Sequence, residues 1–132
     1  MKNLFAILAF STLVLFMPSC SEPDPCYVGS WTMSNPIWIT ATTININNDG
    51  TGTMTVSDPS CTGNTLTRVY SFTYTVNDGT MAFAFSTQGK KCGNNVTFTG
   101  PDAISGITGT LTCEGDAMSV ATTVYTYNFN RN

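Results

Sequence analysis

Residues 66–76 read Leu-Thr-Arg-Val-Tyr-Ser-Phe-Thr-Tyr-Thr-Val, and this stretch decides the fold class. Its large side chains, from Tyr70 to Val76, alternate with Ser71 and the threonines that follow it. A period of two residues places one set on each face of a β-strand, one toward a core and one toward solvent. Residues 77–79, Asn-Asp-Gly, have the chemistry of a tight hairpin turn. An antiparallel partner strand is therefore expected from residue 80.

The same alternation recurs along the chain after residue 27. Strands are expected at residues 28–33, 37–46, 51–57, 66–76, 80–86, 95–99, 107–113 and 117–129. Residues 87–93 are expected to form a polar loop that carries Lys90 and Lys91. The parity of the last segment slips, which predicts a bulge or a break near residues 121–123. About eight antiparallel strands predict an all-β domain, a lipocalin-like up-and-down barrel or alternatively a β-sandwich.

The amino terminus has the pattern of a secretory signal peptide. Lys2 precedes an apolar run over residues 4–17, which is shorter than the roughly 20 residues of a spanning helix. The run leads to Ser19-Cys20, which resembles the lipobox of bacterial lipoproteins. That resemblance implies cleavage after Ser19 and attachment of acyl chains such as palmitate to Cys20. The alternative is ordinary cleavage, which would leave Cys20 as a free or disulfide-bonded thiol.

Three regions are expected from these patterns. Residues 1–19 form the signal peptide, residues 20–27 a lipid-bearing tether, and residues 28–132 one β domain. Glu22, Asp24 and two prolines favour an extended tether. An acidic patch behind a lipidated cysteine also resembles sorting signals of surface lipoproteins. The expected location is the outer membrane, on its periplasmic face or on the cell surface, with the lipid as the membrane anchor.

Four cysteines remain after Cys20, and an even number in an exported domain indicates two disulfides. They are Cys26, Cys61, Cys92 and Cys113. No two of them have the close spacing of a typical zinc-binding pair, and the chain has no histidine. Three connectivities are possible. We expect Cys26–Cys113, which would tie the tether to the last hairpin, and Cys61–Cys92, which would join two loops.

Charge and composition exclude several classes of function. Once Lys2 is removed with the signal peptide, four basic residues remain against eight acidic ones. A nucleic-acid binder needs clustered Lys or Arg, so no nucleic-acid partner is expected. Without histidine, the usual Ser-His-Asp and Cys-His catalytic arrangements are absent. The carboxylates mostly fall in expected turns, so no enzyme, metal site or cofactor is predicted.

Three short motifs resemble lipocalins and the lipocalin-like domains of bacterial lipoproteins. They are Gly29-Ser30-Trp31 in the first strand, Asp49-Gly50-Thr51-Gly52 in a turn, and an aromatic last strand that ends in Arg131. The resemblance implies a barrel in which Trp31 packs across one end and Arg131 stacks on it. It also implies binding of a small apolar molecule, although many such lipoproteins have no known ligand.

Inward-facing aromatic residues would either fill this barrel or line a pocket in it. The candidate lining residues are Trp38, Tyr70, Phe72, Tyr74, Phe83, Phe85, Tyr125 and Tyr127. The leading hypothesis is a non-enzymatic, lipid-anchored barrel that binds a small apolar ligand. The alternatives are an interaction module of a surface complex or adhesin-like protein, which would bind a protein or glycan, and a hydrolase inhibitor. A lined cavity would favour the first hypothesis, whereas a packed core with an outward Trp38 or a tyrosine patch would favour the interaction module.

Overall fold

The structure is a computed structural model, and it describes residues 24–35 and 42–132. This part of the chain consists of β-strands and one 3-10 helix, which confirms the all-β fold class. The elements are β1 (Gly29–Met33), β2 (Thr42–Ile46), β3 (Thr51–Ser57), β4 (Thr67–Asn77), β5 (Thr80–Lys91), β6 (Asn94–Thr97), η1 (Gly100–Asp102), β7 (Gly106–Glu114), β8 (Ala117–Ala121) and β9 (Thr126–Arg131).

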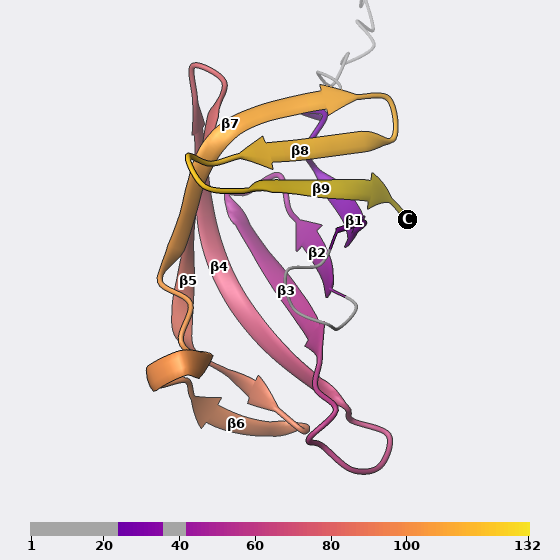
Figure 1. Cartoon of the computed structure of the whole chain (residues 1–132), viewed down its shortest axis with the longest axis vertical. Coiled ribbons are helices and arrows are strands. Elements are labelled where there is room, and N and C mark those ends of the chain that lie inside the picture. The colour runs from indigo at the N-terminus through magenta and orange to yellow at the C-terminus, as the bar shows by residue number, and fades with distance from the viewer. Residues whose placement is uncertain (1–23, 36–41) are drawn as a thin grey trace, which may run out of the picture.

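Eight of the strands close into an antiparallel barrel (Figure 1). β1 to β5 pair in succession, β5 pairs with β7, β7 with β8, β8 with β9, and β9 returns to β1. β6 lies outside this ring and pairs with the second half of β5. The barrel expected from the sequence is therefore the observed architecture, and the sandwich alternative is not.

The hairpin between β4 and β5 forms for the reason that the sequence indicates. Along β4, Tyr70 and Phe72 are buried whereas Ser71 and Thr73 are exposed. The turn residues Asp78 and Gly79 have φ values of 47° and 74°. This left-handed conformation suits a two-residue hairpin, and Asp and Gly adopt it at low cost. Alternation and turn chemistry together set the register of this pair.

The prediction of a polar loop at residues 87–93 is wrong for most of that range, because β5 continues to Lys91. The inward positions of this extension carry no large apolar side chain, so the sequence pattern ends at Phe85. The apolar cover comes instead from Phe98, whose ring lies 2.3 Å from the place that a Cβ on Gly89 would occupy. A glycine under a neighbouring aromatic ring therefore replaces the usual inward apolar residue.

The prediction of a single strand at residues 117–129 is also wrong, because this range contains two strands joined by a turn. β8 ends at Ala121 and β9 begins at Thr126. The Thr122 Oγ1 accepts hydrogen bonds from the backbone N–H groups of Val124 and Tyr125 at 3.3 and 3.0 Å. The slip in parity thus marks a break in the strand that a threonine side chain stabilises.

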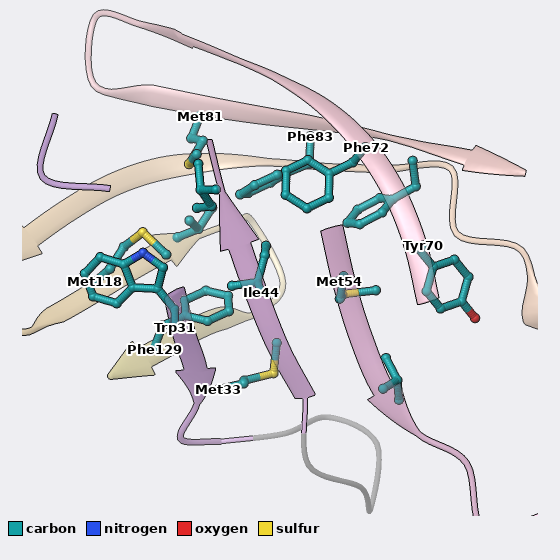
Figure 2. Packing of buried hydrophobic residues seen from close by; sticks show 14 of the residues in the cluster. Trp31, Met33, Ile44, Met54, Tyr70, Phe72, Met81, Phe83, Met118 and Phe129 are labelled. Atoms are coloured by element: carbon teal, nitrogen blue, oxygen red, sulfur yellow. The ribbon is translucent and has the colours of Figure 1, made fainter. Parts of the chain in front are cut away.

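Buried side chains from nearly every strand form one cluster inside the barrel, and none of them is more than 9% exposed. Figure 2 shows Trp31, Phe129 and Met118 together on one side of the cluster, with Phe72 and Phe83 on the other. The rings of Phe72 and Phe83 meet edge to face, with centroids 5.2 Å apart. Each such side chain contributes roughly 1.5–3 kcal/mol on burial, so this cluster dominates the stability of the fold.

Candidate functional site

One end of the barrel, which we call the tryptophan end, is sealed by Trp31 and Arg131. The Trp31 side chain is fully buried, at 0% exposure. The Arg131 guanidinium carbon lies 4.3 Å from the centroid of the Trp31 ring. The indole Nε1 donates a hydrogen bond to the Tyr27 carbonyl at 2.9 Å. The stacking implied by the lipocalin resemblance is therefore present.

Gly29 is required at this end because the Arg131 side chain occupies the space beside it. Its φ is +139°, and a Cβ at this position would lie 2.7 Å from an Arg131 guanidinium nitrogen. The same guanidinium donates hydrogen bonds to the carbonyls of Val28 (3.2 Å) and Cys26 (2.9 Å). One side chain thus stacks on the tryptophan and fixes the backbone that leads into β1.

The two disulfides join the expected partners. Cys26 pairs with Cys113, with Cα atoms 6.1 Å apart, and Cys61 pairs with Cys92, with Cα atoms 5.4 Å apart. The first bond ties the chain ahead of β1 to β7 at the tryptophan end. The second ties the β3–β4 loop to the β5–β6 turn at the opposite end. Cys20 and the predicted cleavage position lie outside the described residues.

The opposite end, which we call the aspartate end, is held by four charged residues. Asp58 is buried, at 2% exposure, and its Oδ2 lies 2.5 Å from the Arg68 Nε. Arg68 also bridges to Asp102 in η1. The Lys91 Nζ lies 3.8 Å from a carboxylate oxygen of each aspartate. This network links the β3–β4 loop, β4, the end of β5 and η1.

The charges of this network are fixed rather than exchangeable. Hydrogen bonds from the Ser60 hydroxyl and then from the Arg68 guanidinium hold the pKa of Asp58 well below its usual value. Asp58, in turn, is the largest cause of the raised pKa of Arg68. Both groups remain ionised near neutral pH, where each is the other's ion-pair partner. The network is structural, and it stabilises the arm formed by β6 and η1.

Sequence reasoning missed this network, although one signal for it exists. Arg68 shares the inward parity of Tyr70 and Phe72. An arginine on an apolar stripe predicts a buried carboxylate partner, because an unpaired charge would be costly there. The identity of the partners could not be read, since Arg68 and Asp102 are 34 residues apart.

The predicted ligand-lining residues do not gather around one cavity. Four of them belong to the buried cluster, namely Tyr70, Phe72, Phe83 and Phe85. Tyr74 lies at the tryptophan end, edge to face with Tyr27 at 5.7 Å. Tyr125 and Tyr127 are half-buried beside the β8–β9 turn, with ring centroids 5.2 Å apart. Trp38 lies outside the described residues.

Two hollows lie on the outer wall of the barrel rather than inside it. One, of about 520 Å³, lies over β3, β4 and β5. The other, of about 420 Å³, lies over β4, β5 and β6. Within residues 24–35 and 42–132 no cluster of His, Cys, Asp or Glu could hold a metal ion. In the same ranges no helix is long and apolar enough to cross a membrane.

No known protein family, curated protein or solved structure matches this chain.

Proposed function

We propose that this chain is a lipid-anchored interaction module of the bacterial envelope, which binds a partner on the outside of a packed barrel and catalyses no reaction. The observation that supports this function is the filled interior. Trp31 and Met81 are fully buried, and the candidate lining residues Phe72 and Phe83 pack against each other. Side chains that fill a core leave little room for a stored ligand.

The tether geometry supports an anchored module of this kind. Cys26 follows Cys20 by six residues, and its disulfide and the Arg131 hydrogen bond fix it at the tryptophan end. An extended chain spans at most about 3.6 Å per residue, so acyl chains on Cys20 would hold this end within about 20 Å of the bilayer. The aspartate end and the outer wall would then face the aqueous side.

Native mass spectrometry of the full lipoprotein, released from its own membrane in detergent, tests this function. The expected mass is the chain from Cys20 onward with acyl groups, two disulfides and no other bound molecule. A Cys20→Ala variant should lose the acyl mass and leave the membrane fraction. A further discrete mass that organic extraction removes would show a stored ligand and overturn the proposal.

A small apolar ligand beside the β8–β9 turn is a second candidate, favoured by the Tyr125–Tyr127 pair. Tyr127 lies opposite Val120 on the inner face of β9, and burial raises the pKa of its phenol. An apolar molecule beside this ring would complete the burial of both tyrosines. In that case Tyr127→Ala should weaken retention of a hydrophobic fluorescent probe about tenfold, a loss of about 1.4 kcal/mol. The matched variant at the tryptophan end, Tyr27→Ala, should leave retention of the probe unchanged.

A further inference from the structure

The two outer hollows adjoin each other, because both are lined by Ser71 at the middle of β4, and we call them together the groove. Their shape follows from the pairing of β4 with β5. The register shifts between Tyr70 and Phe72, where β5 carries extra residues opposite Ser71. A bulge of this kind bends the strand that holds it. Each hollow falls in the range of roughly 300–1,000 Å³ that is usual for ligand sites.

Uncharged hydrogen-bonding side chains are spread along this groove, although most of its exposed lining surface is apolar. They include Thr51, Thr53, Ser71, Thr73, Ser86 and Gln88. Hydroxyl and amide groups can both donate and accept hydrogen bonds. The outward-facing Ala84 and Val69 supply apolar surface between them, and no carboxylate among the described residues lines either hollow. The groove therefore suits a ligand that is rich in hydroxyl groups and has small apolar faces.

Lys90 places one positive charge in the part of the groove that lies over β4, β5 and β6. Its position opposite Val69 and Asn95 turns it to the outer face, where it is exposed. The other basic residues of the described chain, Arg68, Lys91 and Arg131, each form an ion pair. Lys90 forms none with a described carboxylate. Its charge is thus available to an anionic group of a ligand.

We propose that this groove binds a linear carbohydrate that carries carboxylate or phosphate groups, with one anionic group at Lys90 and the sugar hydroxyls along β3, β4 and β5. This inference names the ligand class of the proposed function and rests on it in one respect, that the outside of the barrel is the binding side.

Other occupants fit this groove less well. Extended peptides gain affinity by pairing with a free strand edge. β3, β4 and β5 are each already paired on both sides, so they offer no such edge. A single lysine is too few for a nucleic acid. The exposed large apolar residues of the described chain, Leu66 and Val124, do not line the groove, which disfavours a lipid.

Calorimetric titration of the full lipoprotein in detergent micelles tests the inference. The probes are an oligogalacturonate, its methyl ester as the uncharged control, and a phosphorylated oligosaccharide of the same length, which tells the two anionic groups apart. Saturable binding is expected for at least one charged probe, with the methyl ester weaker by about tenfold, or about 1.4 kcal/mol.

Two pairs of variants localise the binding. Lys90→Glu reverses the charge and Ser71→Tyr fills the middle of the groove, and each should weaken binding by about tenfold or more. Lys90→Arg retains the charge, and Thr112→Tyr adds the same ring to the outer face of β7, so both should bind as the wild type does. Thermal unfolding checks that all four variants fold.

Three outcomes would overturn the inference: no saturable binding of either charged probe, binding that neither Lys90→Glu nor Ser71→Tyr weakens, or preferential binding of an extended peptide in the same groove. None of these would overturn the proposed function, which fails instead if the mass spectrum shows a stored ligand or an unacylated protein.

Discussion

The two ends of the barrel are closed by different kinds of interaction. At the tryptophan end, the buried Trp31 ring, the Arg131 guanidinium and backbone carbonyls pack over the apolar core. At the aspartate end, Asp58 and Arg68 carry the closure with Lys91 and Asp102. Each end also has one disulfide. The comparison suggests that apolar packing carries most of the stability at one end and charge pairing at the other, so the two ends should respond differently to the same perturbation.

Removing the two disulfides separately compares the ends with the same chemical bond. Cys26–Cys113 closes 87 residues and Cys61–Cys92 closes 31. Since the entropy of loop closure grows with loop length, the double Cys→Ser variant at the tryptophan end should lose about 4–5 kcal/mol and the other about 3–4 kcal/mol. Urea unfolding measures both. A larger loss at the aspartate end would mean that its native contacts depend on the covalent bond.

Trp31→Ala removes the apolar seal and should cost about 3–5 kcal/mol in the free energy of unfolding. The buried ring leaves a cavity, and Arg131 loses the surface on which it stacks. Urea unfolding with both disulfides intact is the measurement. Tyr125→Ala, at a half-buried aromatic residue beside the β8–β9 turn, is the control and should cost less than half as much. Equal losses would contradict the assignment of apolar stability to the tryptophan end.

Asp58→Asn tests the charge network and should cost about 2 kcal/mol at pH 7, because it leaves Arg68 with a weaker partner in a half-buried position. The pKa of Asp58 in the folded state lies below its usual value of 3.8. Its contribution is therefore complete above about pH 5 and is lost as the pH falls below 4. The difference in unfolding free energy between the wild type and the variant should shrink steadily as the pH falls from about 4 toward 2.

The matched control for this variant is Asp116→Asn at the other end. Asp116 lies 3.6 Å from Arg131, but its side chain is 90% exposed. Exposed pairs contribute about 0–1 kcal/mol, so this variant should change stability by less than 0.5 kcal/mol at any pH. A pH dependence as strong as that of Asp58→Asn would show that charge pairing closes both ends alike.

The tryptophan end could be read from the sequence because its determinants are local or have a known pattern. Gly29 and Trp31 are two residues apart, and the last strand ends in Arg131 at the register that pairs with Trp31. Two disulfides follow from cysteine count, and their pairing was confirmed. Alternation also predicts β4 and the first half of β5, since each inward position there carries a large side chain.

The aspartate end could not be read in the same way. Its ion pairs join residues of separate segments, and Asp58 and Asp102 both looked like ordinary turn residues. β5 extends past Phe85 without an apolar stripe because Phe98 covers Gly89 from the neighbouring strand. The outer groove depends on the bulge opposite Ser71, which no alternation pattern marks. Each of these features arises from tertiary pairing rather than from local sequence.

The smallest expected effect concerns the tip of the β8–β9 turn. Val124 is 91% exposed, so Val124→Thr, which keeps the side-chain shape, should change the unfolding free energy by less than about 0.5 kcal/mol. The neighbouring variant Thr122→Ala removes the hydroxyl that accepts two backbone N–H groups, and it should cost about 1 kcal/mol. If Val124→Thr proved the more costly of the two, then apolar contact rather than hydrogen bonding would hold this hairpin.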